Sequence, residues 1–355
     1  MRDGDWVHTL WEGNGVGARL ARGALAPAEL LFAAVGAVRS SLYSSGVLAT
    51  LPTAVPALSV GNLTVGGTGK TPLAAHLASR LRGMGARPAI VLRGYGDDEP
   101  LVHRVLNPDV PVVISSDRVA ASIEAQRQGC DVVVLDDAFQ HRRASRVVDV
   151  VVVSADGWHD TRRHLLPAGP WRERLSAASR ATLAVVTRKA ATRERAAEIA
   201  KTMGRIARIP TALVRLETGE LREVNGTSTL PAVSLAGRAV LSVTGIGNPD
   251  AFHAQLSACG ATVHPVAFRD HHRFTESDAV ALALKAEQHD LVVCTLKDAV
   301  KLGPLWPGPS RLWYVSQHVD VETGGDALDA VLNTTLHARF ASTQRGRPGL
   351  PGPPN

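Results

Sequence analysis

A lysine and a hydroxyl residue, Lys70 and Thr71, end a glycine-rich stretch that follows a short apolar run. The stretch reads Thr64-Val65-Gly66-Gly67-Thr68-Gly69. Its end matches the phosphate-loop pattern G-x-x-x-x-G-K-[ST]. Glycines let backbone N–H groups turn towards phosphate oxygens, and the start of the following helix adds positive potential. In such a loop the lysine reaches the β- and γ-phosphates and the hydroxyl holds Mg²⁺, so residues 64–71 are predicted to bind a nucleoside triphosphate.

Two positions of this stretch depart from other phosphate loops. Thr64 occupies the first glycine position of the strict pattern, which leaves a plain glycine-rich turn as the alternative interpretation. Val65 occupies a position where ATPases that switch by dimerising often carry an extra lysine. The valine therefore argues mildly against that class.

Acidic residues follow two further apolar runs. Asp136 and Asp137 come after Val132–Leu135, where a phosphate-loop domain needs a carboxylate for Mg²⁺. Asp97 and Asp98 come after the run Pro88–Leu92, where an acid could accept the proton of an attacking hydroxyl. From the residues alone, a surface turn rich in Gly and Asp is the simpler interpretation of this second site. Further along, Asp270-His271-His272 suggests a metal site or an acid–base pair, with a polar turn as the alternative.

Continuous valine-rich runs predict strands that are buried on both faces, and hence a parallel α/β sheet. The predicted strands are Ala57–Val60, Pro88–Leu92, Val110–Ile114, Val132–Leu135, Val147–Val153, Leu183–Thr187, Leu291–Thr295 and Arg311–Val315. The predicted helices are Pro72–Met84, Val119–Gln128 and Arg193–Arg205. A second α/β unit is predicted to begin at Ala239, before a Gly245-Ile246-Gly247 turn.

These patterns predict a phosphate-loop NTPase-type sheet domain followed by a smaller α/β domain. The expected divisions are an apolar segment at 1–50, a phosphate-loop domain at 51–215, a linker at 216–236, a second domain at 237–341 and a disordered tail at 342–355.

The N-terminal segment contains a nine-residue apolar run, Leu30–Val38, with Glu29 before it and Arg39 after it. It fits a helix that lies in a membrane interface, and it equally fits a core helix packed on the main domain. No run of 18 apolar residues occurs, so no spanning helix is predicted, and no cleavable signal peptide is evident. The three cysteines are far apart and form no C-x-x-C pair, which predicts a reducing compartment.

The net charge of +6 is concentrated in one block. Residues 141–195 carry 12 Lys/Arg against 5 Asp/Glu. Such a block suits an anionic partner, such as an acidic membrane or a phosphorylated substrate, or it is a solvated basic face. Only Trp158 and Trp171 interleave with the charges, which weakens the case for nucleic acid.

Taken together, the chain resembles the tetraacyldisaccharide 4′-kinase family, the lipid A 4′-kinases. The matching segments run in family order from about residue 56 to 301. They are 60–72, Arg93-Gly94-Tyr95-Gly96, Asp98-Glu99-Pro100, 135–141, Leu166-Pro167-Ala168-Gly169-Pro170, 245–249, 270–272 and Lys297-Asp298-Ala299-Val300-Lys301. Threonine in place of the first glycine belongs to this family's own loop.

The resemblance implies transfer of the γ-phosphoryl group of ATP to the 4′-hydroxyl of a lipid A disaccharide 1-phosphate, at the cytoplasmic face of the inner membrane. It implies that Lys70 and Thr71 bind phosphate and magnesium, that Asp98 is the catalytic base and that His271 supports it. The residues implied on the magnesium and phosphate side are Asp136, Asp137, Gln140 and Glu173. Neither nucleic acid nor an obligate protein partner is expected.

The chain also departs from the family pattern. The segment between Gly96 and Asp98 is short, which leaves Asp97 as an alternative base, and Ala138 replaces a usual glycine. Two other hypotheses remain beside the lipid kinase. One is a membrane-docking switch ATPase, and the other is a kinase for a small soluble substrate.

Overall fold

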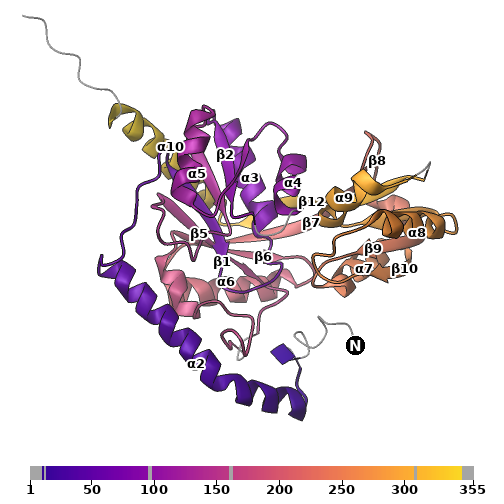
Figure 1. Ribbon diagram of the computed structural model, residues 1–355, viewed down its shortest axis with the longest axis horizontal. Coiled ribbons are helices and arrows are strands. Elements are labelled where there is room, and N and C mark those ends of the chain that lie inside the picture. The colour runs from indigo at the N-terminus through magenta and orange to yellow at the C-terminus, as the bar shows by residue number, and fades with distance from the viewer. Residues whose placement is uncertain (1–9, 12, 95–97, 160–162, 308–309, 346–355) are drawn as a thin grey trace, which may run out of the picture.

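A computed structural model describes residues 10–11, 13–94, 98–159, 163–307 and 310–345. Its central feature is one twelve-stranded sheet with helices on both faces (Figure 1). The strand order is β10-β9-β11-β12-β7-β6-β5-β1-β4-β2-β3, and β8 pairs with β7. The α/β fold class predicted from the sequence is therefore confirmed.

The strands span the following residues: β1 Ala57–Asn62, β2 Pro88–Leu92, β3 Val112–Ile114, β4 Val132–Asp136, β5 Val148–Ser154, β6 Leu183–Arg188, β7 Thr211–Glu223, β8 Thr229–Leu230, β9 Ala239–Thr244, β10 Thr262–Ala267, β11 Leu291–Cys294 and β12 Leu312–Thr323. The α-helices are α2 Val16–Ser44, α3 Lys70–Gly83, α4 Asp98–Leu106, α5 Arg118–Arg127, α6 Arg193–Ala207, α7 Pro249–Ala258, α8 Glu276–Ala286, α9 Leu296–Leu302 and α10 Gly325–Arg345. Three short 3₁₀ helices are η1 Leu175–Arg180, η2 Ala232–Leu235 and η3 Gly303–Leu305.

Strand β1 lies at the centre of the first half of the sheet, parallel to β4 on one side and to β5 on the other. Every residue of β1 and β4 is buried, as their continuous apolar runs predict. Because parallel strands end at the same edge, the segments that follow β1, β2 and β4 emerge side by side. This arrangement brings three of the predicted functional segments to one edge.

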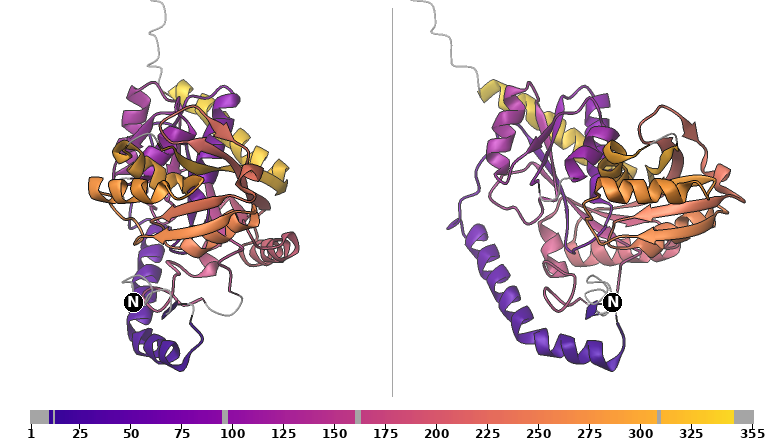
Figure 2. Two further views of the ribbon diagram at one scale, coloured as in Figure 1. Left: turned by 90° about the vertical axis from the view of Figure 1, so that its right-hand side faces the viewer. Right: turned by 45° about the vertical axis from the view of Figure 1, so that its right-hand side comes forward.

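Helices cover the two faces of this half (Figure 2). Helices α3 and α10 pack on one face through a cluster that includes Leu73, Leu77 and Leu332. Helix α6 packs on the opposite face through Ile199 and Met203. The phosphate-loop helix α3 is thus fixed by its apolar side, which leaves its first turn at the edge of the sheet.

The predicted linker at 216–236 is wrong for its first part, because residues 216–223 complete the 13-residue strand β7. This strand pairs in parallel with β6 and in antiparallel with β12, and so joins the two halves of the sheet. Its outer half is only partly buried and carries the adjacent ion pairs Arg215–Glu217 and Arg222–Glu220. The polar composition that suggested a linker therefore belongs to a half-exposed strand. The division into a 51–215 and a 237–341 domain stays a prediction.

Two other segments differ from expectation. Helix α4 begins at Asp98, where the residues alone favoured a surface turn. Helix α10 continues to Arg345, four residues into the predicted disordered tail, and residues 346–355 lie outside the described part of the chain.

Helix α2 stands out from the sheet body along one side of the molecule (Figures 1 and 2). By length and composition alone it could cross a membrane, in contrast to the expectation from run length. Only Arg22 is buried along it, so the interpretation as an ordinary core helix is wrong. Large exposed apolar side chains lie along it: Val16, Leu20, Leu30, Leu31, Val35 and Val38.

We predict that Gly61→Ala destabilises the protein. A Cβ at Gly61 would lie 2.6 Å from both the backbone nitrogen and the Cβ of the fully buried Phe139. Overpacking of this kind lowers the free energy of unfolding by about 1–3 kcal/mol, which urea titration would measure. Gly83→Ala is the matched control, because nothing lies within 4 Å of its Cβ position. Equal stabilities of the two variants would contradict the packing argument.

Candidate active site

The glycine-rich loop between β1 and α3 is held in shape by side chains at its base. Asn62 Nδ2 donates to Thr68 Oγ1 at 3.0 Å, and Thr187 Oγ1 donates to the Thr68 carbonyl at 2.8 Å. Gly69 has a φ of +81° and precedes the first turn of α3. A Cβ there would lie 2.6 Å from Leu216 Cδ1, so both conformation and space call for glycine. Lys70 and Thr71 therefore open the helix, as a phosphate loop requires.

The acids after β4 meet this loop from the neighbouring strand. Asp136 is buried, and its Oδ2 lies 2.9 Å from His103 Nε2, which comes from α4. Its Oδ1 accepts the backbone N–H of Asp137 at 2.9 Å. Burial alone would raise the pKa of Asp136, but His103, Lys70 and this N–H bond outweigh it and lower that pKa. Asp136 is therefore a buried carboxylate held in its charged form.

Asp137 connects the loop to a third segment. Its two carboxylate oxygens lie 2.9 and 3.0 Å from Arg172 Nη1, and Lys70 Nζ lies 3.7 Å from its Oδ1. The backbone φ of Asp137 is +49°, which turns the chain sharply after β4. Lys70, Asp136 and Asp137, which the sequence placed in one site, are brought together.

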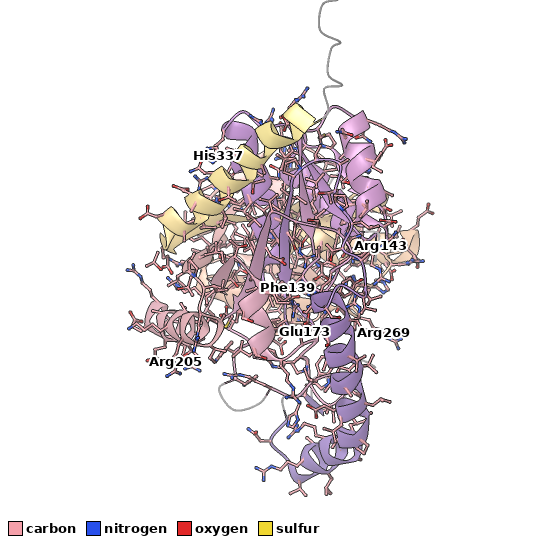
Figure 3. All side chains as sticks on the ribbon, turned by 90° about the vertical axis from the view of Figure 1, so that its left-hand side faces the viewer. Phe139, Arg143, Glu173, Arg205, Arg269 and His337 are labelled. Atoms are coloured by element: carbon pink, nitrogen blue, oxygen red, sulfur yellow. The ribbon has the colours of Figure 1, made fainter. Side chains whose placement is uncertain are left out.

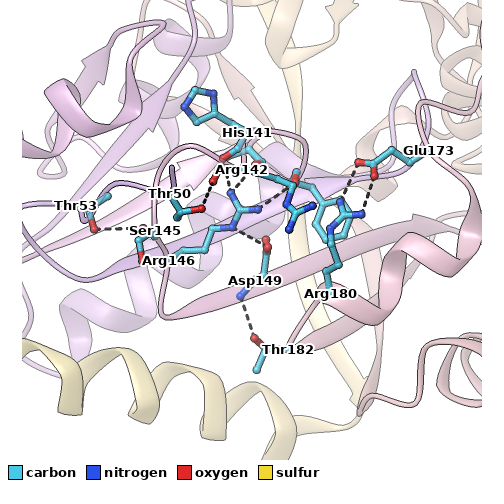
Figure 4. Close-up of polar contacts among 12 residues, drawn as sticks. Thr50, Thr53, His141, Arg142, Ser145, Arg146, Asp149, Glu173, Arg180 and Thr182 are labelled. Atoms are coloured by element: carbon cyan, nitrogen blue, oxygen red, sulfur yellow. Dashed lines mark hydrogen bonds and ion pairs between the residues drawn. The ribbon is translucent and has the colours of Figure 1, made fainter. Parts of the chain in front are cut away.

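Gln140 and Glu173 lie beside this group in different settings. Gln140 Nε2 donates to the Asn62 carbonyl at 2.8 Å, at the foot of the glycine-rich loop. The Glu173 carboxylate is bound by Arg180 at 2.8 and 3.1 Å (Figure 4). Within the described residues no group of three or more His, Cys, Asp or Glu side chains is arranged to hold a metal ion. The structure thus supplies carboxylate oxygens next to Lys70 but no complete metal cage made of protein alone.

Asp98 and His271 come from the two halves of the molecule and meet. Asp98 opens α4, and its side chain is 3% exposed. His271 lies between β10 and α8 with a φ of +56°, and its Nδ1 lies 3.5 Å from Asp98 Oδ2. The second oxygen of Asp98, Oδ1, is buried with no hydrogen-bond partner in the described part of the chain. Asp97, the alternative base, lies outside the described residues.

Charges from the second half of the chain set the electrostatics of Asp98. Burial would raise its pKa, but the interaction with His271 and the charges of Lys297 and Lys301 lower it to about 2. In return the interaction with Asp98 raises the pKa of His271, against the opposing effect of burial. Asp98 is therefore an anion at neutral pH, and its charge favours the protonated form of His271.

Glu99 interacts electrostatically with charged groups near this pair and near the phosphate loop. Its pKa is raised by burial and by Asp136, and the charges of Lys297 and Lys70 oppose the rise. Glu99 therefore experiences charges from both halves of the chain. The loop, the acids after β4 and the Asp98–His271 pair make up one charged site.

Several functional candidates escaped the sequence reasoning. His103 and Arg172, which hold Asp136 and Asp137, gave no signal that could have found them. Lys297 and Lys301 were noticed only as part of a family segment; Lys301 Nζ lies 3.5 Å from Asp298 Oδ1 and donates to the His272 carbonyl at 3.1 Å. Two lysines one turn apart after a buried strand are a usable signal for an anion site, although a weak one.

Comparisons with known proteins lead to one family. A family model described as "Tetraacyldisaccharide-1-P 4'-kinase" matches residues 21–107 and 96–337. The tetraacyldisaccharide 4′-kinase of Halorhodospira halophila (strain DSM 244 / SL1) is 36% identical over 94% of this chain and 98% of its own. The tetraacyldisaccharide 4′-kinase of Anaeromyxobacter sp. (strain K) is 37% identical over 89% of this chain and 92% of its own. The structure is similar to that of LpxK from Aquifex aeolicus in complex with ATP, with a TM-score of 0.70 and 26% sequence identity. The match covers 89% of this chain and 99% of that one.

We predict that His271→Ala costs more stability at about pH 5.5 than at about pH 9. The folded pKa of Asp98 lies below its ordinary value of 3.8, so its contribution is present above pH 3.8 and is lost as pH falls towards 2. The folded pKa of His271 lies above 6.5, so its contribution is complete below 6.5 and is lost as pH rises through the folded value. Because His271 is 54% exposed, screening keeps the difference below about 1 kcal/mol.

Urea unfolding of wild type and variant at the two pH values measures this difference. His337→Ala is the control, since His337 is an exposed residue on α10, away from the site (Figure 3). The control should change stability equally at both pH values. A His271→Ala effect that does not vary with pH would show that the pair is not ionic.

Proposed function

We propose roles for individual residues from one premise: this chain belongs to the tetraacyldisaccharide-1-P 4′-kinase family. The reaction follows from this membership: ATP donates its γ-phosphoryl group to the 4′-hydroxyl of a tetraacyldisaccharide 1-phosphate in lipid A biosynthesis. The alternatives, a switch ATPase and a kinase for a small soluble substrate, are not favoured by this membership.

On the ATP side we assign the loop Thr64–Gly69 to the phosphates, with Lys70 reaching the β- and γ-phosphates. The supporting observation is the position of Lys70, 3.7 Å from Asp137 at the opening of α3. An incoming γ-phosphate would replace part of the negative charge that Lys70 now neutralises. The Asp137 carboxylate therefore holds the Lys70 amino group at the place where negative charge would develop on the transferred phosphoryl group.

The residues present suit Mg²⁺ of the kind that accompanies nucleotides. Magnesium prefers hard oxygen ligands and commonly takes one or two carboxylates together with substrate phosphates, so a complete protein cage is not needed. We assign the Thr71 hydroxyl, Asp136 and Asp137 to it, with Gln140 and Glu173 as outer residues. Bound there, the ion would neutralise charge on the phosphates. Glu173 is the weakest assignment, because Arg180 occupies its carboxylate.

We assign Asp98 as the residue that receives the proton of the 4′-hydroxyl. A pKa of about 2 makes it a weak base in the ground state. This weakness suits phosphoryl transfer, whose transition state is loose and asks mainly for positioning of the nucleophile. Its Oδ1, which has no hydrogen-bond partner within the described residues, offers the acceptor, while His271 holds Oδ2. The Asp98–His271 contact between the two halves of the chain is the observation that carries this assignment.

We propose that α2 lies in the plane of the membrane at its cytoplasmic face, where ATP is available. All residues of α2 that are at least partly buried, except Leu42, lie on one side of the helix: Ala18, Arg22, Leu25, Ala26, Glu29, Ala33, Ser40 and Tyr43. With 3.6 residues per turn they form one stripe, and Leu20, Leu31 and Val38 lie about half a turn away from it. The helix therefore has a body-facing stripe and an opposite apolar face suited to lipid. A spanning helix would not keep Glu29, at its middle, bonded to the protein body.

We predict that purified protein transfers phosphate from Mg²⁺-ATP to a tetraacyldisaccharide 1-phosphate in detergent. Lys70→Ala should remove the activity, because it removes the phosphate clamp. Asp98→Asn, which keeps the shape but not the charge, should lower kcat by about 10²–10⁴-fold while ATP still binds. Radiolabelled phosphate on the lipid is the measurement. Acceptor-independent ATP hydrolysis with no labelled lipid would overturn the assignment in favour of a switch ATPase.

We also predict that Leu31→Asp together with Val38→Asp weakens membrane binding at least tenfold. A large apolar side chain contributes about 1.5–3 kcal/mol when it is buried, and about 1.4 kcal/mol is a factor of ten. Sedimentation with phosphatidylethanolamine–phosphatidylglycerol vesicles is the assay. Ser41→Asp, a charge placed at an exposed polar position of the same helix, is the control. Vesicle binding that survives the double substitution would rule out this face as the docking surface.

A further inference from the structure

The single carboxylate on α2 is bonded to a loop rather than to solvent. Glu29 is the only acidic residue between Val16 and Ser44. Its side chain is 19% exposed; Oε1 accepts the backbone N–H of Leu165 at 2.7 Å, and Oε2 lies 3.1 Å from His164 Nδ1. A charge next to an apolar face is costly unless it is bonded in this way. Glu29 therefore fixes one particular segment of the body against the middle of the helix.

That segment, residues 164–172, is a compact loop that we call the strap. Leu166 N donates to the Trp171 carbonyl at 2.9 Å, and Trp171 N donates to the His164 carbonyl at 3.2 Å. Gly169 closes the turn, since a Cβ there would lie 2.4 Å from the His164 carbonyl oxygen. The strap is internally bonded and can transmit a displacement from one end to the other as a unit.

The far end of the strap is bonded to the phosphate loop. Val65 N donates to the Pro170 carbonyl, and Arg172 N donates to the Leu63 carbonyl, both at 2.7 Å. Thr64 and Trp171 form an isolated antiparallel bridge between the two segments. Arg172, the last residue of the strap, holds the Asp137 carboxylate. Every step from Glu29 to the nucleotide site is therefore a hydrogen bond between adjacent segments.

Two further contacts fix the strap to the N-terminal segment. Trp11 Nε1 donates to the Pro167 carbonyl at 3.0 Å. Ala33, one turn after Glu29, packs against the apolar cluster that contains Leu165 and Trp171. The strap is thus held between α2 on one side and the phosphate loop on the other.

We propose that Glu29 is a positioning residue of the phosphate loop, which acts through the strap so that lipid-surface docking of α2 and ATP binding favour one another. This inference rests on the proposed docking of α2. Docking holds α2 against the body, Glu29 then holds the strap, and the strap holds Val65 and Asp137 in the arrangement that accepts phosphate. Because coupling between two binding events is reciprocal, each must tighten the other by the same factor.

The test measures the Kd of Mg²⁺-ATP by calorimetry, with and without phosphatidylethanolamine–phosphatidylglycerol vesicles that contain no disaccharide acceptor. For the wild type we expect vesicles to lower this Kd by about fivefold or more, and ATP to lower the apparent Kd for vesicles by the same factor. For Glu29→Ala we expect one ATP Kd under both conditions, equal to that of the wild type without vesicles. In transfer assays this variant should show a raised KM for ATP with kcat near the wild-type value.

Two variants control for structure. Glu29→Gln keeps an oxygen that accepts from Leu165 N but loses the charge, so its coupling should be intermediate. Ser41→Ala, at an exposed position of the same helix, should couple like the wild type. A purely structural role of Glu29 would lower stability and kcat in Glu29→Ala without removing the vesicle dependence of the ATP Kd.

The outcomes separate the two proposals. An ATP Kd that vesicles do not change in the wild type, or that they still change in Glu29→Ala, overturns the positioning role. Wild-type protein that does not sediment with vesicles overturns both the docking of α2 and this inference. Wild-type protein that sediments but transfers no phosphate to acceptor lipid overturns the kinase assignment alone.

Discussion

Three carboxylates converge on the sheet edge after β1, β2 and β4, and each is paired with basic side chains drawn from other segments. Asp136 is matched by His103 and Lys70, Asp137 by Arg172 and Lys70, and Asp98 by His271 with the lysines of α9. An uncompensated buried charge would cost several kcal/mol. The need to compensate these charges brings together α4, the strap and the second half of the chain. The site is therefore assembled by electrostatics as much as by packing.

This balance also explains how the site can handle a highly charged substrate. Lys70 already lies next to negative charge, so an ATP phosphate bound as proposed would exchange one anionic partner for another. Asp98 remains an anion because the positive charges around it outweigh its burial, and its Oδ1 has no hydrogen-bond partner among the described residues. A site organised in this way is prepared before the substrate arrives, which is the condition under which electrostatic stabilisation is most effective.

The sequence predicts the central part of the fold and most residues of the candidate site, for reasons that are local. The apolar runs of β1 and β4, the loop at 64–71 and the acids after β4 follow from periodicity and motif. Strand β7 did not, because its outer half is polar and resembles a linker until β12 is placed beside it. The Arg180–Glu173 pair and the bond from Glu29 to the strap could not be predicted from the sequence either. Each joins segments that only the fold brings together. Composition also left open which side of α2 faces the body.

The antiparallel pairing of β7 with β12 has a mechanical consequence. This ribbon joins the half that carries Lys70 to the half that carries His271, and the two strands are paired along most of their length. Its register shifts between Val315 and Gln317 and again between Val321 and Thr323. Irregularities of this kind bend and twist a ribbon locally without breaking it. The Lys70 side and the His271 side of the site are therefore joined by a continuous, locally bent sheet and not by a single unpaired strand of chain.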